Sequence, residues 1–600
     1  MRTKWFGVVS LLIVAGLILA ACAPAAGTPV VQTVIVEGEV MVVTTTPEAE
    51  AGGPKVLRVG DFLGGDVPTL DPGLATDTSS VQIVNMLTVG LTYLDEVTAT
   101  LYPGMAESWD VSEDGLTYTF HVRQGIPWVK YDGTEVVQVM DCQETPAPRT
   151  VTAYDFEYGI KRALAPETAS DYAYVLGFAI KGANEYNTGE GTVDDVAVKA
   201  IDEKTLEVTF LEDVAFNTNI IGLWTARAVP KWLIEGDDCT EARGDKWTET
   251  GFNQAFGPYA LKEWIHDTSI TVIKNPFWPG IENLGVSKVD EVYFAMLDEV
   301  PQFAEYEAGN LDVSNVPLPD MDRVMADPVL SEELSISPSL CTYNYYFNNK
   351  APFVDDVRVR RALSMAIDRQ ALIDNVTKGG QEPAQWFARP GLVAAPTMAD
   401  YPDLGIQYDP VAAKAQLDEY LAEKGITAAD VDLTLMFNTS SGHQKIAEAI
   451  QQMWKDTLGV DVKLTNQEWA VYLKTTLDPQ ATPQIFRKGW CQDYPDANNF
   501  TRDVFIRSGH ENPSAGGGVG FEPGAGNYDE FEKLVLAAAG EKDQAKRTEL
   551  YAQAEEILVD TDAVIAPIYW YTGVSVTKPN VSRTFGVAGH EEYTTWDVTK

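Results

Sequence analysis

The sequence predicts a mixed α/β protein that folds as several domains, and two observations support this. About 545 of the 600 residues follow an unusual N-terminal segment, which is enough chain for two or three domains with cores of their own. Patterns typical of strands and of helices also alternate along this length without a fixed short repeat. Such alternation is typical of α/β chains and argues against a solenoid or a propeller.

Local patterns predict the individual elements. Residues 55–60 and 204–210 alternate apolar and polar side chains like half-buried strands, and two more strand-like runs flank a turn at 112–115. Thr152 and Asp155 form a capping-box pattern, which predicts a helix running to about residue 163. In the second half we expect helices over 355–375, 409–425, 442–458 and 543–559, and strands over 460–464 and 566–571.

The N-terminus has the pattern of a secretion signal. Arg2 and Lys4 precede an apolar stretch at 8–19, and this stretch is too short for a confident membrane span. The alternative is a signal anchor that is not cleaved.

Residues 19–22 (LAAC) resemble the bacterial lipobox, in which cleavage leaves a cysteine that carries a diacylglycerol. The resemblance implies a lipoprotein signal peptide over 1–21 and lipidation of Cys22. Residues 22–54 are rich in Ala, Pro, Thr and Gly and predict a flexible tether. We therefore expect a soluble body that is secreted and held at the membrane by lipid.

The chain is strongly acidic. Its Lys and Arg against its Asp and Glu give 44 − 88 = −44, and removal of Arg2 and Lys4 with the signal gives 42 − 88 = −46. Such a surface disfavours nucleic acid and anionic lipid and favours solubility. We expect no nucleic-acid partner.

Five cysteines are present, and four remain if Cys22 carries lipid. An even number outside the cytoplasm suggests two disulfides among Cys142, Cys239, Cys341 and Cys491, with three possible pairings. A zinc site is the less favoured alternative, because no two of these cysteines are close in sequence and the histidines are scattered.

Catalytic motifs are missing from the sequence. It has no Gly-x-Ser-x-Gly elbow and no phosphate-binding loop, and His510-Glu511 and His590-Glu591 lack the second His of a zinc protease motif. Acidic pairs are abundant, as expected of so acidic a chain. Together with its many aromatic residues, the sequence therefore favours a binding protein without metal or cofactor over an enzyme.

The segment 489–500 (GWCQDYPDANNF) is the strongest candidate binding site. It sets the carboxylate of Asp493 beside the indole of Trp490 and the open backbone of Gly489. A carboxylate suits an ammonium, an aromatic wall suits a side chain, and bare backbone suits hydrogen bonds. The alternative is a tight turn that holds a core tryptophan.

Several passages, in order from about residue 55 to 600, resemble the family 5 extracytoplasmic solute-binding proteins of ABC importers, and most closely their oligopeptide-binding branch. No single motif is specific by itself, but the order of the motifs over more than 500 residues is specific for this family. They are 67–72 (VPTLDP), 106–110 (AESWD), 132–134 (DGT), 151–156 (VTAYDF), 257–261 (GPYAL), 340–349 (LCTYNYYFNN), 356–363 (DVRVRRAL), 466–469 (NQEW) and 489–494 (GWCQDY).

The resemblance implies an α/β clamshell of the periplasmic-binding-protein class II type, with a ligand cleft between two lobes. Three domains are expected. Domain I would comprise 55–77, 228–340 and 573–600, domain II would comprise 78–227, and domain III would comprise 341–572.

The resemblance also implies roles for single residues. Asp493 would pair with the N-terminal ammonium of a peptide, and the cleft would hold the peptide extended. The backbone contacts would come from Val67, Gly489 and Cys491, and the side-chain pockets would be walled by Trp469, Trp490, Tyr172 and Tyr174.

The carboxylate end of the peptide is expected at Arg487 and His443. The alternative for Arg487 is a structural ion pair. The alternative for His443 is a hydrogen bond at the start of a helix. Two further basic positions of the family fall on Thr377 and on Thr475 or Thr476, which leaves the preferred peptide length open.

In the oligopeptide branch the cysteine of LCTY pairs with that of GWC, which implies a disulfide between Cys341 and Cys491 and leaves Cys142 and Cys239 as the second pair. The implied partners are a peptide, the permease subunits of an ABC transporter with cytoplasmic ATPases, and the membrane through the lipid on Cys22. The protein would act as an extracytoplasmic or periplasmic monomer.

Rival functions are the same fold with another solute (an oligosaccharide, a nickel chelate or an opine), a secreted hydrolase, and a signalling receptor.

Overall fold

The computed structural model describes residues 53–60, 62, 64–478, 480–507, 509–511 and 519–599, and the backbone of strands β1 (Val30–Val36) and β2 (Glu39–Thr45). The chain divides into two units, Met1–Gly53 and Pro54–Lys600. In the first unit β1 and β2 pair as an antiparallel hairpin, within the segment predicted as a tether. The predicted signal peptide and Cys22 lie outside the described residues. No helix within the described ranges is long and apolar enough to cross a bilayer.

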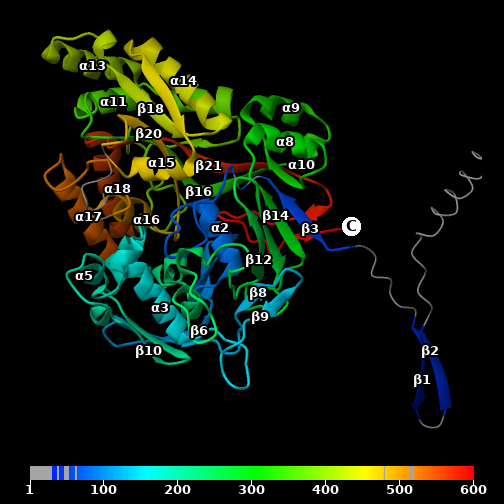
Figure 1. Cartoon of the computed structure of the whole chain (residues 1–600). Coiled ribbons are helices and arrows are strands. Elements are labelled where there is room, and N and C mark those ends of the chain that lie inside the picture. The colour runs from blue at the N-terminus through cyan, green and yellow to red at the C-terminus, as the bar shows by residue number, and fades with distance from the viewer. Residues whose placement is uncertain are drawn as a thin grey trace, which may run out of the picture. The chain divides into compact units, whose positions relative to one another are not determined.

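An 11-stranded sheet runs through the second unit (Figure 1). Its order is β12-β13-β14-β3-β15-β21-β16-β20-β18-β19, and β17 pairs with β21. The bounds are β3 Val56–Val59, β12 Tyr259–Ile265, β13 Ser269–Lys274, β14 Glu291–Ala295, β15 Val313–Asn315, β16 Leu334–Phe347, β17 Glu382–Pro383, β18 Leu433–Asn438, β19 Val462–Gln467, β20 Ile485–Cys491 and β21 Ile565–Thr577.

The long strands β16 and β21 join the two halves of this sheet. Residues 334–338 pair with 572–576 on the side of β15, and residues 342–346 pair with 565–570 on the side of β20. Between these stretches the register shifts, because residues 339–341 of β16 lie opposite the single residue 571 of β21. An irregularity of this kind bends a ladder and leaves backbone groups unpaired.

Smaller sheets surround the main one. β10, β11, β7 and β6 form a four-stranded antiparallel sheet, and the pairs β4-β5, β8-β9 and β22-β23 form hairpin-like ladders. Their bounds are β4 Thr92–Asp95, β5 Thr100–Pro103, β6 Ala106–Val111, β7 Thr117–Val122, β8 Val129–Tyr131, β9 Val136–Gln138, β10 Val198–Asp202, β11 Thr205–Thr209, β22 Val581–Ser582 and β23 Asp597–Val598.

Helices pack around the sheets of the second unit. In Figure 1 α11, α13 and α14 gather at one end of this unit, and α3 and α5 lie at the other. The bounds are α2 Thr78–Leu87, α3 Ala153–Leu164, α4 Ala173–Ala179, α5 Ala183–Asn187, α6 Asn217–Ile220, α7 Lys231–Ile234, α8 Glu299–Glu307, α9 Met321–Ala326, α10 Leu330–Glu333, α11 Val357–Met365, α12 Arg369–Leu372, α13 Pro410–Lys424, α14 Ser441–Leu458, α15 Trp469–Thr476, α16 Ala497–Phe505, α17 Tyr528–Gly540 and α18 Gln544–Glu556.

The predicted helix starts and stops are confirmed where local signals were strong. Thr152 and Asp155 form the capping box of α3, and Gly425 ends α13 with a φ of 67°. The single helix predicted over 355–375 is wrong. Asp368 accepts a hydrogen bond from the backbone N–H of Ala371 and starts α12 after a break, so the segment forms two helices and a π-helical turn.

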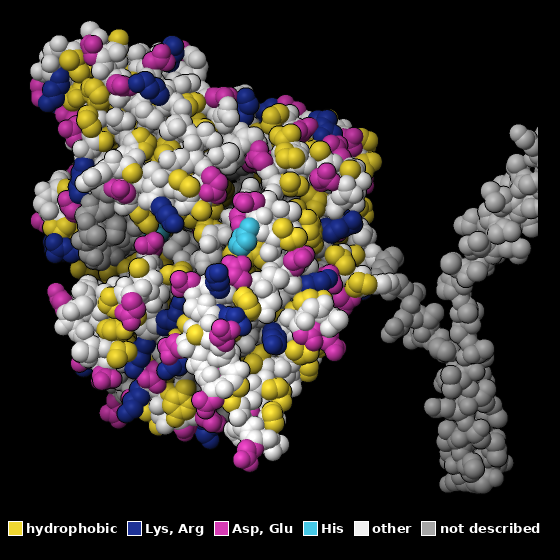
Figure 2. All heavy atoms as spheres, in the orientation of Figure 1, with side chains coloured by type: hydrophobic (Ala, Val, Ile, Leu, Met, Phe, Trp, Pro, Cys, Tyr) yellow, Lys and Arg dark blue, Asp and Glu magenta, His cyan; other side chains and the backbone are white. Residues whose placement is uncertain are grey.

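Buried apolar side chains form several clusters. The largest continues from α3–α5 to α16–α18, a second lies between α11, α13, α14 and β18, and a third covers one face of β12–β14. On the exterior, carboxylates are spread over the face shown in Figure 2 with Lys and Arg interspersed.

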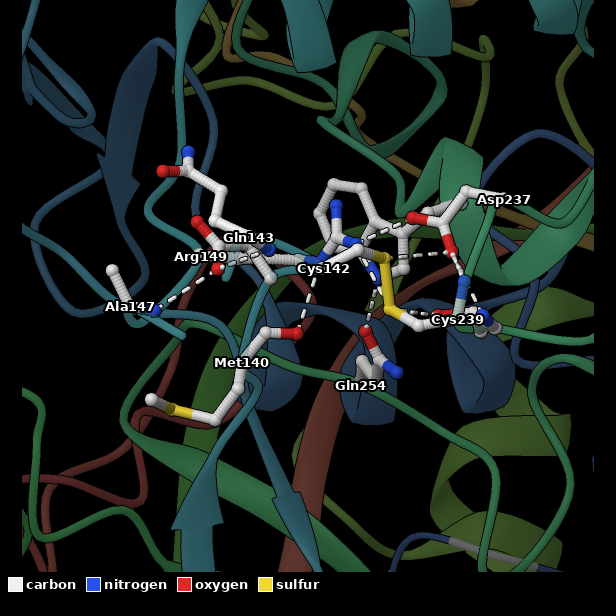
Figure 3. The surroundings of a disulfide bond; sticks show 11 residues. Met140, Cys142, Gln143, Ala147, Arg149, Asp237, Cys239 and Gln254 are labelled. Carbon is white, nitrogen blue, oxygen red and sulfur yellow. Dashed lines mark hydrogen bonds and ion pairs between the residues drawn. A yellow bond between two sulfur atoms is a disulfide. The ribbon is translucent and has the colours of Figure 1, made fainter. Parts of the chain in front are cut away.

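Both cysteine pairs expected from the sequence are disulfides. Cys341 and Cys491 are bonded across the ladder of β16 and β20, at directly opposite positions. Cys142 and Cys239 are bonded between two exposed loops (Figure 3). There Arg149 donates to Asp237 and lies 4.5 Å from the ring centroid of Trp232, which fixes the two loops to each other.

Candidate functional site

A small cavity lies at the turn that follows β20, and we call it the site cavity. It has a volume of about 90 Å³ and is bounded by residues 76–78, by α15 and by residues 487–493. Its lining includes Asp77, Tyr172, Trp224, Trp469, Arg487, Lys488, Trp490, Asp493, His510 and Glu511. Charged groups enclosed so closely interact strongly, so the partner of each one decides what the cavity can bind.

Asp493 presents a carboxylate with neutral partners only. The Tyr172 hydroxyl lies 3.0 and 3.1 Å from its two oxygens, and Asn499 Nδ2 donates to it at 2.9 Å. The Asp493 N–H in turn donates to Asn499 Oδ1. No cation pairs with Asp493 among the residues that the structure describes. Burial raises the pKa of Asp493 to about 7, because it disfavours the charged carboxylate. A cation that enters the cavity would stabilise the charged form.

This pKa predicts a pH-dependent stability. Folding raises the pKa of this carboxyl from 3.8 to about 7. The carboxyl therefore does not lower the free energy of unfolding below pH 3.8, and lowers it progressively as the pH rises to 7. At 1.36 kcal/mol per pKa unit the penalty is at most about 4 kcal/mol. We expect Asp493→Asn to raise the thermal unfolding temperature of the ligand-free protein at pH 8 and to leave it unchanged at pH 4. A difference of the same size at both pH values would contradict this assignment.

Asp77 is a second carboxylate in the site cavity, and a helix start compensates it in part: burial still raises its pKa, and its Oδ2 has no hydrogen-bond partner among the described residues. Its side chain accepts from the N–H groups of Ser79 and Ser80 as the N-cap of α2, and Trp469 Nε1 lies 3.3 Å from its Oδ1. A helix N-terminus carries partial positive charge, which balances a capping carboxylate. Asp77 therefore serves the fold and orients Trp469.

Lys488 and Glu511 compensate each other. Their charged atoms lie 2.5 Å apart, and His510 Nδ1 lies 2.9 Å from the same carboxylate oxygen. Burial alone would raise the pKa of Glu511, but Lys488 and His510 lower it to about 2. This pair is internally neutral and leaves no charge for a ligand.

Arg487 is the uncompensated cation of the site cavity. Its guanidinium donates to Tyr571 Oη and Asn438 Oδ1 and lies 4.7 Å from the ring centroid of Tyr343. Within the described part of the chain no carboxylate pairs with it, so the structural ion pair weighed from sequence is not formed there. A carboxylate entering the cavity would find a preformed donor.

His443 does not line the site cavity, although Arg487 is near enough to help lower its pKa. It lines a different cavity together with Glu299, and its Nδ1 lies 3.4 Å from Tyr343 Oη. Its backbone N–H donates to Ser440 Oγ at the start of α14. Burial lowers the pKa of His443 well below its usual value, so the neutral ring offers no charge to a peptide carboxylate.

Beside the site cavity, one edge of β20 has no strand partner among the residues that the structure describes, and we call it the free edge. β18 pairs with β20 only at Ile485 and Phe486, and β16 pairs along its other edge. Gln492 N–H donates to Leu340 of β16. Because alternate residues of a strand direct their backbone groups to opposite edges, Gly489 and Cys491 direct theirs away from β16. The position of these two residues therefore suits backbone bonding to an extended ligand.

Val67 does not line the site cavity, which residues 76–78 help to form. Its side chain is 2% exposed and belongs to the buried cluster on β12–β14. The predicted contact is one of its backbone groups, and it stays a prediction.

Three of the four predicted pocket aromatics line the site cavity, namely Tyr172, Trp469 and Trp490. Tyr174 does not, because it packs behind Tyr172 with ring centroids 5.1 Å apart. Trp224 and Asn499 were not predicted from sequence. Asn499 accepts from both the Asp493 N–H and Trp490 Nε1, and its place one helical turn after the capping Asp496 is the only local signal for that role.

Comparison with known proteins gives the family. The family model for bacterial extracellular solute-binding proteins, family 5 middle, matches residues 100–511. The chain is 34% identical over 523 residues to the oligopeptide-binding protein OppA of Bacillus subtilis, which covers 86% of this chain and 87% of that protein.

Solved structures agree with this result. The murein tripeptide-binding protein MppA of Escherichia coli superimposes with a TM-score of 0.76 at 26% identity, over 92% of this chain and 99% of that one. Its unliganded open form, over 92% and 98%, gives 0.60 at the same identity. The likeness confirms the predicted α/β clamshell fold, in an arrangement less similar to the open form. The chain therefore belongs to the bacterial extracellular solute-binding proteins of family 5, and it is a binding protein, not an enzyme.

Proposed function

We propose that this protein binds peptides outside the cytoplasm and delivers them to the permease of an ABC importer. The observation that carries the proposal is the pair of uncompensated charges in the site cavity, the carboxylate of Asp493 and the guanidinium of Arg487. A peptide is a zwitterion, so its ammonium and its carboxylate each offer one of these charges a partner. The printed names of the relatives, oligopeptide-binding and murein tripeptide-binding, support the same ligand class.

Between its charged ends the ligand would lie extended along the free edge of β20. Backbone groups of Gly489 and Cys491 would bond to it, and backbone groups are the same in every peptide, so sequence preference at these positions is low. Trp469, Trp490 and Tyr172 would form the walls of the side-chain pockets. Because His443 lies in a separate cavity, we assign the ligand carboxylate to Arg487 alone.

Ligand binding would close two lobes about a hinge. The register shift of β16 against β21 near residue 340 supports a hinge there, because it interrupts the two long strands that join the halves of the sheet. The proposed division is 55–77, 228–340 and 573–600 for domain I, 78–227 for domain II, and 341–572 for domain III.

The finer details of location and partners are also proposals. Cleavage after residue 21 and lipid on Cys22 would hold the protein at the membrane, with residues 22–54 as a tether. The protein would act as a monomer without a cofactor, and its protein partners would be the permease subunits with their cytoplasmic ATPases.

Native mass spectrometry tests the ligand class. The secreted chain from residue 23 on, purified from a peptide-rich lysate, is expected to carry adducts that fragment as short peptides. The Asp493→Asn variant, prepared in parallel, is expected to carry none. Adducts that are sugars or metal chelates, without any peptide, would contradict the proposal.

A further inference from the structure

A second cavity shares part of its wall, including Asp493, with the site cavity, and we call it the rear cavity. Its volume is about 70 Å³, and five residues of its wall, namely Val81, Trp224, Gln492, Asp493 and His590, also line the site cavity. Asp493 thus stands on the wall that the two cavities share. A ligand group attached next to an ammonium at Asp493 would therefore lie beside this shared wall.

Arg227 lines the rear cavity as a buried cation with almost no partners. It is 8% exposed, and its one hydrogen bond runs from Nη2 to Asn85 Oδ1. Nε and Nη1 have no partner, and no carboxylate pairs with this guanidinium within the described residues. A Cβ at residue 90 would lie 2.1 Å from Nη1, so the glycine there is what leaves room for the guanidinium. Burial lowers the pKa of Arg227 to about 9, which still leaves it charged at neutral pH.

Two other buried arginines show how this chain satisfies a structural guanidinium. Arg360 and Arg369 are 6% and 4% exposed. Arg360 donates four hydrogen bonds to backbone carbonyls, and Arg369 donates four to carbonyls and to the hydroxyl of Ser364. Arg227 lacks such a set. Because two of its nitrogens have no acceptor, the burial of Arg227 is not explained by a structural role like that of Arg360 and Arg369. A ligand that brings an acceptor would explain it.

Gln492 adds a second unsatisfied group. It is 3% exposed, and neither its side-chain oxygen nor its side-chain nitrogen has a partner. It precedes Asp493 in the chain and lines both cavities. Between these polar groups the wall is apolar, from Met86, Leu94, Leu223 and Leu284, which suits methylene groups.

The carboxylates of the rear cavity are better satisfied than its arginine. Glu592 accepts from Tyr93 at 2.6 Å and from both the N–H and the hydroxyl of Thr594. Glu96 accepts from the N–H of His590 at 3.2 Å, with His590 Nδ1 at 3.5 Å. Glu591, the third glutamate of the wall, accepts from Arg583 at 2.8 Å and from the N–H of Gly586 at 3.1 Å. Each of the three glutamates thus has hydrogen-bond donors, whereas Nε and Nη1 of Arg227 lack acceptors among the described residues.

We propose that the rear cavity takes the side-chain carboxylate of a peptide whose first residue is acidic, with Arg227 as its partner. The inference rests on the proposed function, because it requires the ligand's ammonium at Asp493. It adds a preference for the first residue of the peptide, whereas the backbone contacts of the site do not depend on the peptide sequence. The amide of Gln492 would donate to the same carboxylate, and the apolar wall would cover its methylene groups.

Four tripeptides test the preference by isothermal titration calorimetry on the native, ligand-free secreted chain at pH 7.5. They are Glu-Ala-Ala, its neutral isostere Gln-Ala-Ala, Lys-Ala-Ala and Ala-Ala-Ala. We expect Glu-Ala-Ala to bind about tenfold more tightly than Gln-Ala-Ala, as for a newly paired buried charge. Equal affinities for these two, or tightest binding of Lys-Ala-Ala, would overturn the inference. If none of the four binds, the proposed function itself fails.

The variant Arg227→Met assigns the preference to the residue. Its Glu-to-Gln affinity ratio is expected to fall to about one, with Ala-Ala-Ala binding unchanged, because only the charge partner is lost. The ligand-free variant should unfold at the same temperature as the native protein or higher, since a buried charge without a counter-ion is removed. Arg227→Lys should keep part of the preference. A Glu-to-Gln affinity ratio that is unchanged in Arg227→Met would contradict the assignment. If this variant does not fold, the affinities of the native protein for the four tripeptides still test the inference.

Discussion

Replacing Asp493 by Asn is expected to weaken binding of the tripeptide Ala-Ala-Ala by about 100-fold or more. Asn keeps the size of the side chain and still accepts from Tyr172 or Asn499, so the change removes the charge and little else. Loss of one partner of a desolvated charge pair costs roughly 2–5 kcal/mol, because the ligand's ammonium is left buried and unpaired. Calorimetry at pH 7.5, above the pKa of about 7, measures the change directly.

Asp77→Asn is the matched control, since Asp77 is a buried carboxylate of the same cavity. Asn caps a helix as well as Asp does, so α2 keeps its N-cap and Trp469 keeps an acceptor. We expect the affinity for Ala-Ala-Ala to change by less than about threefold. A large loss in Asp77→Asn with none in Asp493→Asn would show that the ammonium binds at the start of α2 instead.

Replacing both Cys341 and Cys491 by Ser is expected to lower the free energy of unfolding by about 3–5 kcal/mol. The bridge joins residues 150 apart in sequence, so the unfolded chain gains much conformational freedom when it is lost. It also fastens β20 to β16 two residues before Asp493. We therefore expect a weakening of peptide binding of about tenfold, because the anchor and the free edge of β20 lose their fixed position. Urea unfolding followed by tryptophan fluorescence measures the stability.

The second disulfide supplies the control. Cys142 and Cys239 are 97 residues apart, so their loss by double Ser replacement should lower stability by a comparable amount. Neither residue lines the site cavity, so peptide affinity should stay unchanged. Equal losses of affinity in the two double variants would contradict a specific role of the Cys341–Cys491 bridge in bracing the site.

Sequence was informative where a structure is determined locally. Asp409 and Pro410 at the start of α13 and Gly425 at its end act within one helical turn, and the capping box at Thr152 does too. The break in the helix predicted over 355–375 was missed although Asp368 is a good N-cap. The apolar periodicity continued across it, and the cap at Asp368 is accompanied by a long-range hydrogen bond from Arg369 to the carbonyl of Pro567, which sequence does not reveal.

Of the site, the residues on the 489–494 motif were predictable and the distant ones were not. Asp493, Gly489 and Trp490 lie within one turn, so their proximity follows from the chain itself. Val67 and His443 were assigned by resemblance alone; neither lines the site cavity, and their roles toward a ligand stay predictions. The state of Arg227 is invisible in sequence, because whether a guanidinium has partners depends on residues far away along the chain.

The central claim is that Asp493 binds the ligand's ammonium, and one comparison tests it most directly. Calorimetry with Ala-Ala-Ala and with N-acetyl-Ala-Ala-Ala, on the native protein and on Asp493→Asn, isolates the interaction of the two groups, because acetylation removes the ammonium and keeps the peptide backbone. The account predicts that acetylation weakens binding to the native protein by about 100-fold and has no further effect on the variant. Equal affinity of the native protein for the two peptides would contradict it.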